Sequence, residues 1–93
     1  MELPQNYVKM NSYQRRIVRQ EYQMRQDGKC YYCKSDLSEK PPFFVTKKKI
    51  YWNKFPEGFL NNPIHLHHCH KTGMTIGAVH AYCNAVLWQY HGE

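Results

Sequence analysis

The stretch that decides the fold is residues 64–88, IHLHHCHKTGMTIGAVHAYCNAVLW, in which polar and apolar residues follow a recognisable order. A cluster of histidines comes first. Lys71-Thr72-Gly73-Met74 then predicts a tight turn, because glycine adopts a positive φ without strain. Residues 75–81 predict a returning strand that suits a half-buried pleated surface. Asn84 stands where a helix N-cap would, ahead of residues with good helical propensity. The stretch therefore predicts a β-hairpin that runs into a helix.

Two residue pairs with the same spacing indicate a structural zinc ion. Cys30-x-x-Cys33 lies upstream, and His80-x-x-Cys83 lies just ahead of the predicted helix. Two such pairs separated by a long insert are typical of a closed tetrahedral zinc site. Cys69 in place of His80 gives an alternative set of four cysteine ligands. We favour His80, because it shares a knuckle-like pair with Cys83, whereas Cys69 lies on the strand with the histidine cluster.

Residues 67–84, HHCHKTGMTIGAVHAYCN, together with the upstream Asp27-Gly28-Lys29-Cys30-x-x-Cys33, resemble the core of HNH, or ββα-metal, endonucleases. They are most similar to the phage endonuclease VII-like recombination nucleases. The resemblance implies a small, zinc-stapled, treble-clef-like α+β domain that cleaves DNA and leaves 5′-phosphate and 3′-hydroxyl ends. His80 would replace the first cysteine of the family's second zinc pair.

The resemblance also implies roles for the histidine cluster, position by position. His67 stands where that family has a metal-binding aspartate, and Asn84 stands at its metal-binding asparagine. His68 stands at the general-base histidine and His70 at the second histidine. Cys69 replaces a second aspartate, and no role carries over to it.

Those roles agree with the chemistry of phosphodiester hydrolysis. A neutral imidazole suits a general base, and His68 is the candidate. A divalent cation held by His67 and Asn84 would bind the phosphate, and so few protein ligands leave positions open for water. Magnesium or manganese fits this role, and the mixed nitrogen and oxygen set also admits nickel or zinc. His70 is a second catalytic candidate that could orient a phosphate, and His91 is a reserve metal ligand.

The composition predicts one small domain with an anionic partner. A chain of 93 residues buries too little surface to be comfortably stable alone, so a structural zinc would contribute to folding. The net charge is +6, and twelve of the thirteen lysines and arginines precede residue 55, whereas all six histidines follow it. One half therefore suits an anionic polymer and the other suits chemistry, which makes DNA the leading partner.

The cysteines and the hydropathy bear on the compartment. No apolar run approaches transmembrane length, so we expect no membrane association. No signal peptide is recognised, and the spacing of the cysteines beside histidines favours metal in a reducing compartment over two disulfides. We therefore expect a cytoplasmic protein, in a bacterial host cell if the gene is phage-borne.

The upstream half divides into three predicted segments. Residues 12–26 predict a basic amphipathic helix, capped by Ser12 and ended by Asp27-Gly28. Residues 28–34 predict a zinc knuckle. Residues 43–54 form a basic aromatic insert, whose part FFVTKKKIYW predicts a strand or hairpin arm with most of its aromatic side chains in the core. The candidate DNA-binding side chains are basic: Arg15, Arg16, Arg19, Lys47, Lys48, Lys49, Lys54 and Lys71.

The sequence therefore predicts a single HNH endonuclease domain over residues 1–93, with its ββα core at 64–91. We expect a metal-dependent enzyme of phage or mobile-element origin that cleaves DNA. A non-catalytic zinc module that binds nucleic acid or protein is the alternative, followed by an inactive HNH domain. A homodimer, or a phage or host protein partner, stays open.

Overall fold

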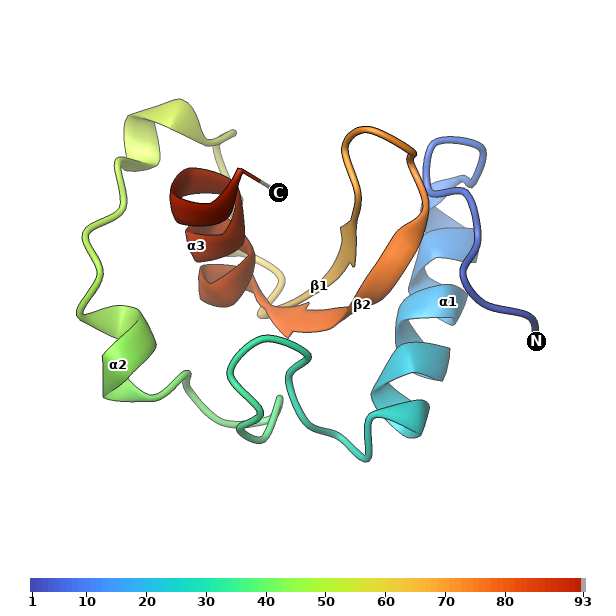
Figure 1. The fold of residues 1–93 in the computed structure, drawn as a ribbon, viewed down its shortest axis with the longest axis horizontal. Coiled ribbons are helices and arrows are strands. Elements are labelled where there is room, and N and C mark those ends of the chain that lie inside the picture. The colour runs from blue at the N-terminus through green and yellow to red at the C-terminus, as the bar shows by residue number, and fades with distance from the viewer. Residues whose placement is uncertain (93) are drawn as a thin grey trace.

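The computed structural model describes residues 1–92 and is centred on one antiparallel hairpin (Figure 1). β1 (Ile64–His68) pairs with β2 (Thr75–His80), and the register shifts between His67 and His68. The connecting turn has Gly73 at φ 78°, a conformation that only glycine adopts readily, so the predicted turn is confirmed. The hairpin separates α1 from α3, as Figure 1 shows, and it positions every group described below.

The basic helix α1 (Ser12–Arg25) forms where the sequence predicts it, but Asn11 rather than Ser12 caps it. The Asn11 side chain accepts a hydrogen bond from the backbone N–H of Gln14, and the Gln14 side chain accepts one from the backbone N–H of Asn11. This reciprocal capping box satisfies two amide groups that the first helical turn would leave unpaired. A single Ser12 cap offers only one such bond, which explains why the helix boundary falls one residue earlier.

α1 packs on the hairpin through only a few of its residues. Val18 and Tyr22 are its buried residues, and the Tyr22 hydroxyl lies 2.8 Å from the Thr75 hydroxyl inside the core. At the helix end, the Gln26 side chain donates to the Ala78 carbonyl at 2.9 Å and accepts from the Ala78 amide at 2.8 Å. Gln26 thereby occupies the free edge of β2, where an unpaired strand edge would otherwise face solvent.

The C-terminal helix α3 (Ala81–His91) follows β2 without an intervening loop. The residue at its N-cap is His80, so the prediction that Asn84 caps the helix is wrong. The strand ladder ends at His80, and the Ala81 amide donates to the Pro63 carbonyl at 2.8 Å, which starts the helix directly at the ladder's end. Asn84 therefore lies one turn inside the helix, where its side chain can meet β1.

The insert is helical and not extended, which corrects the predicted strand. α2 (Phe43–Thr46) is one short helix, and η1 (Trp52–Lys54) is a 3-10 turn. The Pro42 carbonyl accepts from the Val45 amide at 2.9 Å, so the proline pair that precedes the insert begins a helical turn. No strand of residues 1–92 lies beside this segment to complete a ladder, and β propensity without a partner strand does not make a sheet.

The prediction that most aromatic side chains of the insert form the core is also wrong. Val45 and Ile50 are buried, but the aromatic residues around them are 39–78% exposed: Phe43, Phe44, Tyr51 and Trp52. A four-residue helix has one buried side, and Val45 occupies it. Tyr82 of α3 holds the insert in place, because its hydroxyl donates to the carbonyl oxygens of Thr46 and Lys48.

The N-terminal segment docks on the hairpin turn. The Tyr7 amide donates to the Gly73 carbonyl at 2.8 Å, and the Thr75 amide donates to the Gln5 carbonyl at 2.8 Å. Asn6 and Met74 form an isolated antiparallel bridge. These bonds bring Tyr7 to the end of β1 that carries the histidine cluster.

The core is small and includes the cysteines. Its largest fully buried side chains come from the insert, the hairpin, α3 and the loop of the first cysteine pair: Val45, His67, Val79, Cys83, Val86 and Cys30. The structure is therefore an α+β fold of one two-stranded sheet and covering helices. No helix within residues 1–92 is long and apolar enough to cross a bilayer.

Candidate functional site

The four predicted zinc ligands converge in one buried cluster. The ligand atoms of Cys30, Cys33, His80 and Cys83 all lie within 4.8 Å of one another. The His80 Nδ1 atom is 3.4 Å from Cys33 Sγ and 3.6 Å from Cys83 Sγ. A thiolate and an imidazole on one tetrahedral zinc stand about 3.6 Å apart, given the usual bond lengths. The cluster therefore fits a zinc ion, and Cys69, in the hairpin turn, is not part of it.

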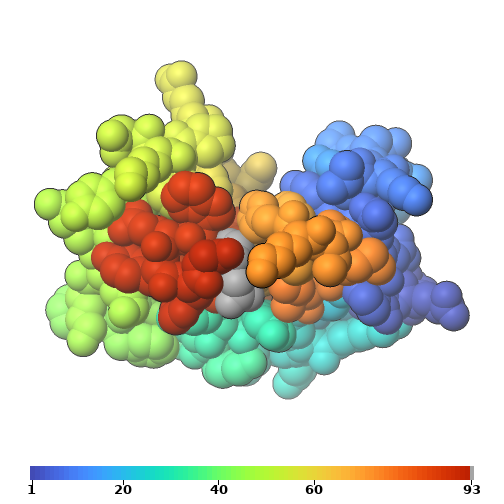
Figure 2. Space-filling view, turned by 45° about the horizontal axis from the view of Figure 1, so that its top comes forward, coloured from blue at the N-terminus to red at the C-terminus, as the bar shows by residue number. Residues whose placement is uncertain are grey.

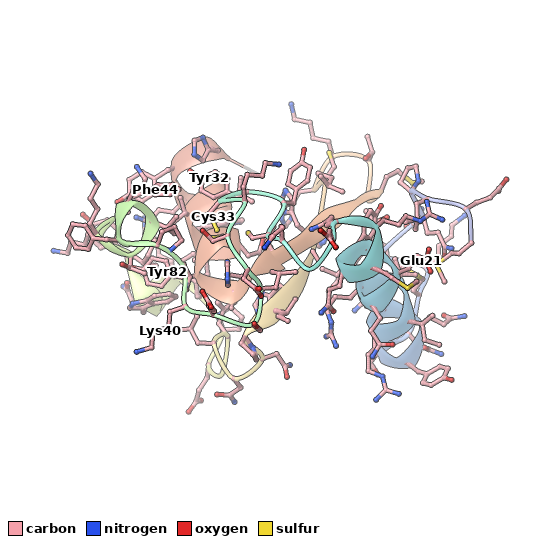
Figure 3. All side chains as sticks on the ribbon, turned by 90° about the horizontal axis from the view of Figure 1, so that it is seen from below. Glu21, Tyr32, Cys33, Lys40, Phe44 and Tyr82 are labelled. Atoms are coloured by element: carbon pink, nitrogen blue, oxygen red, sulfur yellow. The ribbon has the colours of Figure 1, made fainter. Side chains whose placement is uncertain are left out.

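The first ligand pair sits on a tight loop that the sequence builds locally. The Cys33 amide donates to Cys30 Sγ, and the Cys30 amide donates to the Ser35 carbonyl at 2.8 Å. Lys34 takes a positive φ of 66°, which turns the chain back after the second cysteine. Figure 3 shows Cys33 and Tyr32 on this loop, beside α3. The predicted knuckle is thus present.

His80 is held in the tautomer that a metal ligand needs. Its Nε2–H donates to the carbonyl oxygens of Asp36 and Glu39, both at 2.9 Å. The proton on Nε2 leaves the Nδ1 lone pair directed at the three sulfur atoms. Backbone carbonyls that orient a ligating imidazole in this way are a regular feature of zinc sites.

The thiols of the cluster share their protons unequally. A hydrogen bond from the Cys83 thiol lowers the pKa of Cys30 to about 4, and the same bond, followed by burial, raises the pKa of Cys83. Burial raises the pKa of Cys33. One thiolate is therefore already favoured, and a divalent cation that binds here displaces the remaining protons.

A second site is a groove of about 630 Å³, whose lining includes none of the four residues of the cysteine cluster. The N-terminal segment and α1 form one side, and residues 54–62 with Trp88 of α3 form the other. Figure 2 shows these two sides as separate masses, yellow and blue, with a hollow between them above the orange hairpin turn. The floor is β1 with its histidines.

The groove gathers most of the predicted catalytic residues. His68, His70 and Asn84 all line it, and so does His65, which the sequence left without a role. His67 is 1% exposed within β1, and it is not among the described residues that line the groove. The predicted pairing of His67 with Asn84 around an ion therefore stays a prediction.

The Asn84 side chain contacts His65. The Asn84 Nδ2 atom lies 3.1 Å from His65 Nδ1, across the gap between α3 and β1. Burial lowers the pKa of His65, which keeps its imidazole neutral and able to accept this hydrogen bond. With its nitrogen engaged, the Asn84 amide directs its carbonyl oxygen away from His65. An amide oxygen on the surface of a groove is a suitable ligand for a hard divalent cation.

His68 stands in a stack of three flat groups. The Tyr7 ring is the middle group of the stack. Its centroid lies 3.8 Å from the His68 ring centroid at an interplanar angle of 7°, and the Arg15 guanidinium lies 3.8 Å from the same Tyr7 centroid. His70 lies 4.7 Å from His68 between ring centroids. Burial, and then the neighbouring charges of His70, His67 and Arg15, lower the pKa of His68 to about 4. The ring is therefore neutral at neutral pH, which is the form that accepts a proton.

The predicted DNA-binding residues divide into two groups. Arg15, Arg16, Arg19 and Lys54 line the groove. The remaining lysines lie outside it: Lys47, Lys48 and Lys49 on the insert, and Lys71 in the hairpin turn. His91, the reserve ligand, lies against the Tyr32 hydroxyl at 3.2 Å and also outside the groove.

His65 and Tyr7 are the site residues that sequence reasoning missed. His65 carried a usable signal, because it belongs to the same short run of histidines as His67, His68 and His70. Tyr7 carried none, because its position depends on backbone bonds to the hairpin turn.

No protein-family model, curated protein or solved structure matches the chain.

Proposed function

We propose that this protein is a metal-dependent endonuclease of the HNH, or ββα-metal, class that hydrolyses DNA phosphodiester bonds. One observation carries the proposal: His68, His70 and Asn84 gather in a single groove whose side is lined by arginines. Imidazoles supply proton transfer, an amide oxygen supplies a cation ligand, and guanidinium groups bind phosphate. A purely structural zinc module has no use for this combination.

The order of the elements supports the same assignment. A knuckle with two ligands is followed by a hairpin and then by a helix whose start carries the other two ligands. This order agrees with the treble-clef arrangement that the HNH class would have. A zinc ion in the cluster would fix the end of α3 against the knuckle, and so would fix Asn84 relative to β1.

The proposed reaction uses His68 as the general base. His68 takes a proton from a water molecule, the water oxygen forms a bond to phosphorus, and the bond from phosphorus to the 3′ oxygen breaks. The products are a 5′-phosphate and, after protonation of the leaving oxygen, a 3′-hydroxyl. His70, beside His68, could orient the phosphate, and the arginines of α1 would hold neighbouring phosphates.

A divalent cation would neutralise the charge that develops on the phosphate when it is bound. Asn84 would hold it through the amide oxygen, together with His67 as the sequence predicts. His65 would act on this site indirectly, because its contact with Asn84 Nδ2 fixes which atom of the amide faces the groove. Magnesium or manganese suits this oxygen-containing set, and nickel or zinc suits its imidazole.

The alternative is a zinc module that binds nucleic acid without cutting it, or an HNH domain that has lost activity. The feature that favours this alternative is the burial of His67, which the catalytic assignment needs as a cation ligand. The zinc module could also bind a protein instead of nucleic acid. A homodimer or a phage or host protein partner is compatible with all three.

The test is incubation of the purified, zinc-loaded protein with supercoiled plasmid and with a branched oligonucleotide, across magnesium, manganese, nickel and zinc. The proposal expects nicked or linear products that carry 5′-phosphate ends. His68→Ala should form them much more slowly under every metal, and Asn84→Ala should form them more slowly at limiting metal, whereas His91→Ala, a histidine outside the groove, should cut like the parent. If the parent cuts under none of these metals, or if both groove variants cut like the parent, the endonuclease assignment is rejected.

A further inference from the structure

The two sides of the groove differ in chemistry. The α1 side presents guanidinium groups, from Arg15, Arg16 and Arg19. The facing side presents aromatic rings, from Phe55, Phe59 and Trp88. No aspartate or glutamate is among the described residues that line the groove, so nothing acidic neutralises the arginines from within it. The groove is therefore suited to a ligand that is both anionic and aromatic.

The aromatic side is a connected set of rings that reaches the histidine floor. Phe55 meets Trp88 edge to face at 5.1 Å and meets Phe59 at 4.9 Å between centroids. Phe59 in turn lies 4.7 Å from the His65 ring. Trp88 is 42% exposed, although the three residues before it, Ala85, Val86 and Leu87, are buried. A rigid, exposed indole supported from behind by other rings is a surface on which a nucleobase can stack.

The cationic side contains a donor that awaits a partner. The Nε–H of Arg19 is buried and has no hydrogen-bond partner among residues 1–92. Arg19 lines the same groove as His65, His68 and His70. A buried donor without an acceptor is unfavourable, and a phosphate oxygen would satisfy it.

We propose that the groove holds an unpaired stretch of DNA, with its phosphates on the arginines of α1 and its bases on the aromatic side. This inference rests on the proposed DNA-cleaving function and names its substrate class. In a duplex the faces of the bases are covered by their neighbours in the stack, so the rings of the groove would have nothing to pack against. An unpaired strand exposes those faces, and the scissile phosphate then lies over the histidine floor.

The test measures binding by fluorescence anisotropy, using zinc-loaded protein without any second metal. The probes are a labelled single-stranded DNA of about 12 nucleotides, within the usual site size, and the same strand annealed to its complement as a blunt linear duplex. We expect the single strand to bind at least ~10-fold more tightly, because only it can use the aromatic side. Equal affinities, or tighter binding of the duplex, would overturn the inference.

Substitutions of Trp88 locate the effect. Trp88→Ala should weaken single-strand binding by roughly 5- to 150-fold, the usual loss for one stacked base, and should leave duplex binding unchanged. Trp88→Phe keeps a stacking ring and should retain most of the affinity. Phe43→Ala is the matched control, because Phe43 is 78% exposed on α2 and outside the groove. Equal losses for both probes would reject stacking in the groove.

A spectroscopic measurement serves if Trp88→Ala does not fold. In a Trp52→Phe variant, Trp88 is the sole tryptophan. Single-stranded DNA should shield its fluorescence from acrylamide, and the duplex should not. Shielding by neither probe, or a stronger effect from RNA of the same sequence, would overturn the inference. None of these measurements requires cleavage, so an enzyme that cuts but has no single-strand preference would refute this inference alone.

Discussion

The cysteine cluster and the histidine groove differ in how far their polar groups are already engaged, although β1, β2 and α3 contribute residues or support to both. In the cluster, four ligand atoms lie within 4.8 Å of one another, all four residues are buried, and His80 is oriented by two carbonyls. In the groove, the histidines and Asn84 line an open space of about 630 Å³ beside arginines. Four converging ligands fill the coordination sphere of a zinc ion, whereas the groups of the open groove leave positions at which a substrate can bind.

The comparison teaches that a small domain can separate stability from chemistry. His80 and Cys83 lie at the start of α3, and Asn84 is the next residue. The ion that would fix the helix therefore also fixes the position of a groove residue, without taking part in the groove's chemistry. Changes at the cluster should alter folding and activity together, and changes in the groove should alter activity alone.

The largest effect is expected at the cluster. Cys30→Ser removes a buried zinc ligand, and structural zinc contributes roughly 10–16 kcal/mol of apparent binding free energy to small domains. We expect loss of the cooperative thermal transition, measured by circular dichroism, together with loss of stoichiometric zinc.

Cys69→Ser is the matched control for that variant, because Cys69 lies in the hairpin turn outside the cluster. It should keep both zinc and the melting transition. A Cys30→Ser protein that melts like the parent without bound zinc would show that the cluster does not hold the fold together.

The next largest effect is expected at the floor of the groove. His68→Ala removes the proposed base, and loss of a positioned general base commonly lowers the rate by roughly 10²–10⁴-fold. Single-turnover cleavage should show this loss, while zinc content and melting temperature stay those of the parent. If His68→Ala also lost zinc, the separation of the two regions would be wrong.

A smaller effect is expected where α3 meets β1. His65→Leu removes the acceptor that orients Asn84, and loss of such a supporting contact typically weakens metal affinity by about 10–100-fold. The metal concentration that gives half-maximal cleavage should rise, and the maximal rate should largely recover at saturation. His65→Gln retains an acceptor and should lie closer to the parent.

Asn84→Ala extends that prediction, because it removes the side-chain amide that His65 orients. Its defect should be at least as large as that of His65→Leu and should also shrink as metal is raised. Equal metal requirements in the parent and in both variants would remove His65 and Asn84 from the cation site.

The smallest effect is expected in the salt dependence of DNA binding. Each phosphate contact contributes about 0.7 to the slope of log affinity against log salt for single strands. Arg16→Gln with Arg19→Gln should therefore flatten the slope more than replacement of all three insert lysines by glutamine, since only the arginines line the groove. A larger change from the lysine variant would place the DNA path on the insert.

Local signals in the sequence were sufficient for much of this structure. The turn at Gly73, the strand at 75–80 and the helix at 12–25 all follow from residue preferences over short spans. The knuckle and its partner pair follow from spacing, because ligands three residues apart on a tight turn or on a helix start face the same point.

The errors share one physical cause. The FFVTKKKIYW segment has β propensity but no neighbouring strand, so the preceding prolines and the packing of Val45 made it helical. Asn84 has the preference of a capping residue, but the ladder ends at His80, so the helix N-cap is His80, four residues before Asn84. Propensity is a weak prior wherever a partner from elsewhere in the chain decides the conformation.

The sequence by itself predicted the two ligand pairs, the hairpin and helix, and the basic character of α1, because each of these depends on residue type and spacing over a short span of the chain. Only the tertiary structure decided which side chains line the groove and which of them contact one another. The contact of His65 with Asn84, the Tyr7 ring on His68 and the aromatic side facing the arginines join residues 19 to more than 60 positions apart. Such contacts depend on how elements pack, and packing is set by the whole chain at once.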